Sequence, residues 1–138
     1  MTRFYDLDAA NATIPELASI VATLAEQREE LVRLRDHATA RGATVAEPAG
    51  SPSDEDDEDL RLTRLRMRGL IDQMAAGVAR IDALGLTLRD IERGLVDFPA
   101  LVAGRQVWLC WVKGEDSIGW WHDLEAGFAG RRPLTELS

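Results

Sequence analysis

The chain has 138 residues, 46% of them hydrophobic, which suits one ordinary domain with enough apolar material for a core. The single cysteine excludes an internal disulfide framework and the common multi-cysteine zinc patterns, and the formal net charge is −8. No apolar run approaches membrane-spanning length, and no secretory signal pattern opens the sequence, so we expect a cytoplasmic protein without a membrane partner.

The negative charge is concentrated in residues 42–59, which carry seven acidic residues and no basic one. Basic residues gather only modestly, at Arg61, Arg64, Arg66 and Arg68. Binding to a nucleic-acid backbone depends on several Lys or Arg side chains that neutralise phosphates together. The composition therefore makes nucleic acid an unlikely partner.

The stretch TIPEL predicts the start of a helix, with Thr13 as N-cap, Pro15 in the first turn and Glu16 completing a capping box. The preceding FYDLDAAN is expected to form a separate helical turn against the base of this helix. Gly42 is expected to cap its C-terminal end. Apolar residues then recur at steps of three and four and form one line along the helix, which we call its seam, with a single polar residue, Gln27. The seam consists of Leu17, Ile20, Leu24, Gln27, Leu31, Leu34 and Ala38.

The same periodicity returns after the acidic stretch and ends at Gly85. Two helices of roughly 25 residues, each about 38 Å long, are natural antiparallel partners. The intervening segment 42–59 is rich in Pro, Gly, Ser and acidic residues and is predicted to be a disordered loop at the far end of the hairpin. The second seam consists of Leu60, Thr63, Met67, Leu70, Met74, Gly77, Ile81 and Leu84.

Beyond residue 85 the sequence changes to short runs rich in β-branched and aromatic residues. The tail EAGFAGRRPLTEL has too much Gly and Pro to predict regular structure. The expected fold class is α+β: a long antiparallel, coiled-coil-like helical hairpin (1–85), then a small antiparallel β-sheet (86–138) packed on the hairpin base as one compact unit. The predicted strands are 86–91, 94–98, 105–112 and 117–123.

Four blocks of the sequence resemble a bacterial family known as domain-of-unknown-function family 2203. They are FYDLDAANATIPEL, GLVDFPAL, LCWVKGE and WWHDLEAGFAGR, and the resemblance covers nearly the whole chain apart from the acidic loop. The family carries no activity that can be transferred. The match to its motif implies that the positions to watch are Asp97, Cys110, Trp111, Glu115, Trp121, His122, Phe128 and Arg131.

The last two predicted strands form a hairpin whose register decides whether Cys110 and His122 meet. A two-residue type II′ turn would place Trp111 opposite Ile118 and would turn Cys110 and His122 to opposite faces. A longer loop, with Val112 opposite Ile118, would put both side chains on one face. The sequence leaves both registers open.

Only the longer loop can assemble a metal site, for which the candidate ligands are Cys110, Glu115, His122 and Asp123, with Asp97 nearby. Zinc needs three or four such ligands in near-tetrahedral geometry, and this spacing matches no established zinc pattern. The alternative is a buried cysteine that acts as a small hydrophobe and a histidine bonded to a carboxylate. No cofactor is predicted, and a divalent metal is the alternative.

No catalytic residue is assigned. A thiol between two tryptophans lies in surroundings that raise its pKa, which disfavours Cys110 as a nucleophile. Asp97 is expected to bind loop N–H groups or to pair with Arg131. The candidate functional or ligand-contacting residues are Asp97, Trp111, Glu115, Trp121, His122, Asp123, Phe128 and Arg131.

Each face of the predicted β-hairpin is apolar, whereas the helical hairpin can cover only one. Phe128 and Leu134 of the tail, a second copy of the chain or another protein must cover the second face. The first hypothesis is therefore a non-enzymatic interaction or adaptor module, homodimeric, that uses a Trp-rich face.

Two alternative functions depend on other residues. One is a small metal-dependent or ligand-binding enzyme built around Glu115, His122, Asp123 and Arg131. The other is a regulator that enters the RNA polymerase secondary channel, since a helical hairpin with acids 54–59 at its tip is similar in outline to such factors, whose tip acids help to hold a catalytic Mg²⁺.

Overall fold

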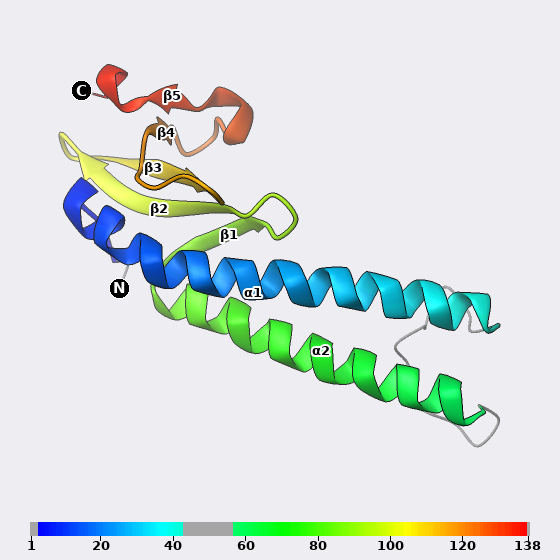
Figure 1. Ribbon diagram of the computed structural model, residues 1–138. Coiled ribbons are helices and arrows are strands. Elements are labelled where there is room, and N and C mark those ends of the chain that lie inside the picture. The colour runs from blue at the N-terminus through cyan, green and yellow to red at the C-terminus, as the bar shows by residue number, and fades with distance from the viewer. Residues whose placement is uncertain (1–2, 43–56, 138) are drawn as a thin grey trace.

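The computed structural model describes residues 3–42 and 57–137 as two helices followed by an antiparallel sheet. Figure 1 shows the helices side by side, with the sheet at the end of the hairpin that also holds both chain termini. This arrangement confirms the predicted α+β class. The elements are α1 (Leu7–Ala40), α2 (Glu58–Ala83), β1 (Thr87–Asp90), β2 (Leu95–Val102), β3 (Arg105–Val112), β4 (Trp120–His122), η1 (Phe128–Gly130), β5 (Arg132–Pro133) and η2 (Leu134–Glu136).

The two predicted seams form the contact between the helices. Gln27, the polar interruption of the first seam, donates from Nε2 to Oε1 of Gln73 on α2 at 3.3 Å. A side chain at Gly77 would start 2.9 Å from Leu24, so this glycine allows the helices to approach closely. The seam residues that are buried in this contact and in the adjoining core are Leu17, Ile20, Leu24, Ala38, Leu60, Thr63, Met67, Leu70 and Ile81.

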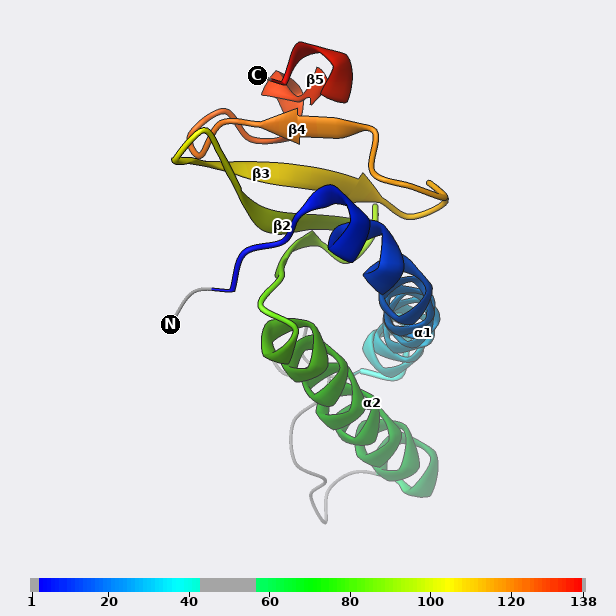
Figure 2. The ribbon, with the colours of Figure 1, turned by 90° about the vertical axis from the view of Figure 1, so that its left-hand side faces the viewer.

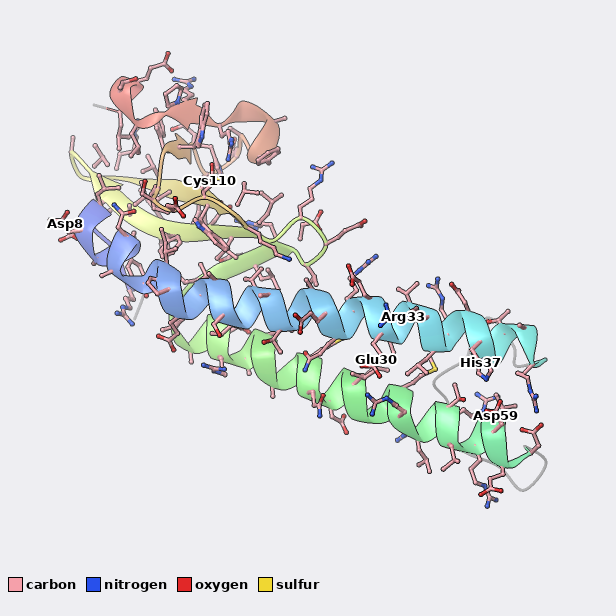
Figure 3. All side chains as sticks on the ribbon, in the orientation of Figure 1. Asp8, Glu30, Arg33, His37, Asp59 and Cys110 are labelled. Atoms are coloured by element: carbon pink, nitrogen blue, oxygen red, sulfur yellow. The ribbon has the colours of Figure 1, made fainter. Side chains whose placement is uncertain are left out.

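The far end of the hairpin is closed by polar contacts between the last turn of α1 and the first turn of α2. Nε2 of His37 lies 2.8 Å from Oδ2 of Asp59, and Arg41 pairs with both Asp57 and Asp59. Figure 3 shows His37 and Asp59 facing each other at this end, remote from Cys110 on the sheet. We call this group of four residues the tip clasp.

The predicted start of the first helix is wrong. Helix α1 begins at Leu7, and Asp6 is its N-cap, with a side chain that accepts a hydrogen bond from the N–H of Ala9. The helix therefore continues through Pro15, although a proline inside a helix costs about 3 kcal/mol. Burial of Ala10 and Ile14 in the core offsets that cost, and the exposed position of Pro15 leaves the packed side of the helix intact.

The predicted loop 42–59 is too long at its C-terminal end. Helix α2 begins at Glu58, because Asp57 caps it by accepting a hydrogen bond from the N–H of Leu60 at 2.8 Å. Acidic side chains in a first helical turn also suit the helix dipole. The remaining acids of the predicted tip, at 54–56, and the rest of the predicted disordered loop, at 43–56, lie outside the described residues.

The sheet is a meander in which the strands follow one another in the order β1-β2-β3-β4-β5. Figure 2 shows this succession from β2 to β5, with the first turns of α1 beside it. Side chains on the face toward α1, which we call the inner face, join the buried half of that helix in one core. The inner-face residues in this core are Val96, Phe98, Ala100, Val107, Leu109, Trp111 and Trp121.

Strand β2 was predicted to end before Pro99 but runs through it to Val102. Proline is tolerated in a sheet where its missing N–H faces no neighbouring strand. That condition holds here, because β1 pairs with β2 only as far as Asp97, and the carbonyl of Pro99 on that side accepts from the N–H of Tyr5 at 2.7 Å.

The register between β3 and β4 is that of the longer loop. Cys110 lies opposite Trp120, and Trp108 lies opposite His122. The side chains of Cys110 and His122 are thereby placed on the same face of the sheet, which we call the outer face. Of the two registers that the sequence left open, this is the one that brings them together.

The tail is more regular than predicted. Two of its residues form β5, which pairs with β4 through Trp120↔Pro133 and Trp121↔Arg132. The two tail residues expected to cover one face separate: Phe128 lies over the outer face, whereas Leu134 packs against the core that includes the inner face.

Candidate metal centre

Asp97, Cys110 and His122 come from three neighbouring strands and meet on the outer face of the sheet. Asp97 on β2 lies directly opposite Cys110 on β3, and His122 on β4 reaches across β3. One ligand atom from each of the three lies within 4.8 Å of the other two. All three residues are 3% exposed or less, so the cluster is withdrawn from bulk water.

The two ring nitrogens of His122 have different surroundings. Nδ1 lies 2.9 Å from the backbone carbonyl oxygen of Asp123. Nε2 lies 3.1 Å from Oδ2 of Asp97, but the approach lacks the direction of a hydrogen bond, and this buried nitrogen has no hydrogen-bond partner among the described residues. Buried polar atoms are rarely left in this state, so Nε2 requires an explanation.

Arg89 supports Asp97 from the edge of the sheet. The pairing of β1 with β2 shifts register between Leu88 and Asp90, and such irregularities re-aim the side chain between them. Nε of Arg89 donates to Oδ2 of Asp97 at 2.9 Å, while its guanidinium lies 5.1 Å from the ring centre of Trp108. The sequence-based pairing of Asp97 with Arg131 is therefore wrong.

Arg131 instead lies beside the thiol. Its Nη1 is 3.9 Å from Sγ of Cys110, its Nη2 is 3.6 Å from a carboxylate oxygen of Glu115, and its guanidinium covers the rings of Trp120 and Phe128. Burial raises the pKa of Cys110 to about 11, against the smaller opposing effect of Arg131. A divalent cation would reverse this balance, since a coordinating thiol is deprotonated.

A cavity of about 260 Å³ opens above the cluster. Its apolar walls include Leu95, Leu124 and Phe128, and its polar walls include Arg89 and Glu125 in addition to the cluster itself. Asp97, Cys110 and His122 therefore have one side packed on the sheet and one side open to a small compartment.

The sequence signature of DUF2203, an uncharacterized conserved protein family, matches residues 3–134. The chain belongs to this family. No curated protein and no solved structure matches the chain significantly. The family description of DUF2203 assigns no activity, so the use of the cluster has to be inferred from its chemistry.

The DUF2203 chain does not form a nucleophilic triad from these three residues. A Cys-His-Asp triad needs the imidazole between thiol and carboxylate, with one ring nitrogen bonded to each. Here Nδ1 of His122 is bonded to a backbone carbonyl, and Nε2 faces the carboxylate. The raised pKa of Cys110 also opposes formation of the thiolate.

The other candidate residues of the DUF2203 chain lie outside the cluster. Glu115 accepts from the N–H of Val112, and the carboxylate of Asp123 pairs with Arg105 at 2.9 Å. Trp111 and Trp121 are core residues of the inner face. Sequence reasoning named the three cluster residues but did not include Asp97 among the primary ligands.

Arg89 was not among the predicted site residues, because its contact with Asp97 depends on the pairing of β1 with β2 and on the register shift in β1.

The two helices also bear on whether the chain could span a membrane. Within residues 3–42 and 57–137, neither helix is apolar enough over a sufficient length to cross a bilayer.

Proposed function

We propose that this protein binds a divalent transition-metal ion, zinc above all, between Asp97, Cys110 and His122. The observation that carries the proposal is the buried Nε2 of His122, which faces a carboxylate oxygen without a hydrogen bond. A cation in contact with both atoms explains why two such groups are held so close together in the interior of the sheet.

The hydrogen bond at Nδ1 fixes the tautomer of a neutral ring. A carbonyl oxygen only accepts, so Nδ1 carries the proton, and Nε2 presents its lone pair to Asp97. Arg89 contacts the carboxylate and not Nε2, so these two electron-rich atoms at 3.1 Å repel each other unless a cation also contacts Nε2. A proton on Nε2 would favour a directed hydrogen bond to the carboxylate, whereas a metal ion beside the N–O line satisfies both atoms.

The spacing of the ligand atoms suits a tetrahedral ion. Zinc lies about 2.1 Å from N and O ligands and about 2.3 Å from S, which places N and O about 3.4 Å apart and S about 3.6 Å from either. The N–O distance is 3.1 Å, and all three ligand atoms lie within 4.8 Å of one another. Binding would require side-chain rotations of the three ligands that close the remaining difference.

The surrounding residues supply the second layer of contacts that metal sites use. A metal-bound histidine usually donates its other N–H to a carbonyl or carboxylate, as Nδ1 of His122 does. A coordinating carboxylate is usually hydrogen-bonded in turn, as Asp97 is by Arg89. Arg131 adds positive charge beside the sulfur of Cys110. Thiolate and imidazole ligands together favour zinc over magnesium or calcium.

Metal content measures this proposal directly. Full-length protein purified without chelator under reducing conditions is expected to hold one zinc per chain by native and elemental mass spectrometry. Asp97→Asn, Cys110→Ser and His122→Ala are each expected to weaken zinc binding by at least about tenfold, since each removes one of three ligands. His37→Ala is the matched control, because the only other histidine lies in the tip clasp, and it should bind zinc as the wild type does.

Two results would overturn the proposal. One is a folded wild-type protein that takes up no zinc or cobalt from a chelator-buffered solution. The other is a His122→Ala variant with unchanged affinity. Circular dichroism of each variant separates lost binding from lost fold, and Cys110→Ala offers a second, smaller change should Cys110→Ser fail to fold.

As a second candidate we propose the homodimeric interaction module expected from the sequence. The Trp-rich face is a weak support, because Trp111 and Trp121 are core residues and arginines cover the rings of Trp108 and Trp120. A better support is the pair Leu62 and Leu65 on α2, 58% and 50% exposed. Sedimentation should then give a dimer that Leu65→Glu dissociates, and a monomeric wild type would exclude it.

A further inference from the structure

The compartment above the cluster has the features of a ligand site rather than of a purely structural metal site. Three protein ligands leave a fourth tetrahedral position, and catalytic or ligand-exchanging zinc sites keep that position open. The cluster residues themselves form part of the cavity wall, so this position faces the cavity and not the sheet. A molecule in the cavity can therefore reach the proposed metal.

We infer that the cavity binds a small oxyanion, a carboxylate or phosphate group, which completes the coordination of the metal and is held at its other side by Arg89. This inference rests on the proposed function. It adds the chemical class of the ligand and the residue that recognises it.

Arg89 is suited to this second contact. Only its Nε is used on Asp97, and its terminal nitrogens have no hydrogen-bond partner within residues 3–42 and 57–137. The side chain is 46% exposed, lines the cavity and lies against the ring of Trp108, which holds the guanidinium in place. A guanidinium whose terminal nitrogens remain available matches the geometry of carboxylate and phosphate oxygens.

The charges around the cavity favour an anion. Asp97 and a Cys110 thiolate would together balance the two charges of the metal, and Arg131 pairs with Glu115, so Arg89 is the cation that remains on the cavity wall. Glu125 also lines the cavity and opposes it, but this residue is exposed and its charge is screened by water. The positive charge offered to a ligand in the cavity is therefore that of Arg89, which the ring of Trp108 holds in place.

The size of the cavity limits the ligand. Its volume of about 260 Å³ lies below the range of about 300–1,000 Å³ that accommodates drug-sized molecules. The apolar walls at Leu95, Leu124 and Phe128 suit a short hydrocarbon portion beside the anionic group. A small carboxylate or a phosphate ester fits, whereas a nucleic acid or a folded partner does not.

The test uses the full-length protein loaded with Co²⁺, whose visible absorption reports its coordination. Acetate and inorganic phosphate are titrated separately at constant ionic strength. At least one should change the cobalt bands saturably, and the pair separates a carboxylate ligand from a phosphate ligand. Arg89→Gln should weaken that binding by about ten- to hundredfold, as expected for lost charge-assisted hydrogen bonds.

Arg28→Gln is the control, because it removes the same charge from an exposed side chain of α1 that pairs with Glu92 and does not line the cavity. It should change the affinity by less than about twofold, given screening at an exposed position. Arg89→Lys keeps the positive charge but lacks the planar, paired donors of a guanidinium. Its affinity for the anion should lie between those of the wild type and Arg89→Gln. Both Arg89 variants are compared after saturation with Co²⁺, so that a weaker hold on Asp97 does not affect the result.

The outcomes distinguish the two proposals. If Co²⁺ binds with a thiolate-to-cobalt charge-transfer band, but neither anion changes its spectrum, the oxyanion inference is wrong and the metal proposal stands. If Arg89→Gln binds the anion with the affinity of the wild type, Arg89 does not contact the anion, and the assignment of Arg89 as the recognition residue is wrong. If Co²⁺ does not bind at all, both proposals fall.

Discussion

The inner and outer faces of the same strands have opposite characters. On the inner face, alternate residues of β2 and β3 are apolar and belong to the same core as the buried residues of α1. On the outer face, the residues between them include an acid, a thiol and, from β4, an imidazole, all buried beside a cavity. Because successive side chains of a strand point to opposite faces, one short stretch of sequence can serve stability and ligand chemistry at once.

The largest effect on stability is expected from substituting two consecutive residues of β3 whose side chains point to opposite faces of the sheet. Leu109→Ala on the inner face should lower the free energy of unfolding by about 2–5 kcal/mol, because it removes the three outer carbons of a leucine that is 3% exposed. Cys110→Ala on the outer face should lower it by only about 1 kcal/mol, since one atom is lost beside an existing cavity. Urea denaturation of chelator-treated protein measures both values. Equal losses would show that the two faces do not differ in this way.

The second test uses the chemistry of the thiol. In chelator-treated native protein, Cys110 should react with a disulfide reagent at neutral pH about a hundredfold more slowly than in urea-unfolded protein. The thiol is 1% exposed, and its burial raises its pKa to about 11 from a usual value near 9. The rate of colour development in the two states provides the measurement. A native rate within a few fold of the unfolded rate would mean that the outer face is open to solvent.

The smallest effect on stability is expected at Asp57, whose carboxylate is exposed, whereas that of Asp97 is buried. The hydrogen bond from the N–H of Leu60 and the nearby Arg41 lower the pKa of Asp57 below its usual range. A lowered pKa in the folded state stabilises the protein above the unfolded pKa of about 3.9, and this contribution is lost as the pH falls through the folded value.

Asp57→Asn retains a good N-cap residue but removes that charge. The variant should melt less than about 3 °C below the wild type at pH 7 and together with it at a pH below both pKa values. Melting curves between these conditions measure the difference.

The sequence predicted the helical hairpin well because its information is local and periodic. Leu17, Leu24 and Ile81 mark the seams by spacing alone, and each is buried as expected. The start of α1 was missed because Thr13 and Pro15 imitate a helix start, while burial of Ala10 and Ile14, which no local rule contains, decides the outcome.

The cluster was harder to predict because it depends on pairing between distant segments. Asp97 meets His122 only because β2 and β4 both pair with β3 in one particular register. A shift of one residue would have turned Cys110 or His122 to the inner face. The position of Arg89 depends further on an irregularity in β1, which the sequence does not mark with a glycine or proline.

The tip clasp has a practical consequence at the other end of the molecule. Arg41 and Asp57, the residues that cap α1 and α2, hold the end of α1 beside the start of α2. Residues 42 and 57 are therefore positioned by the hairpin, and doubling the number of residues between two fixed points costs only about 0.6 kcal/mol in loop-closure entropy. A peptide tag or a small reporter domain can be spliced between residues 42 and 57, with the sheet and its cluster at the opposite end left as they are.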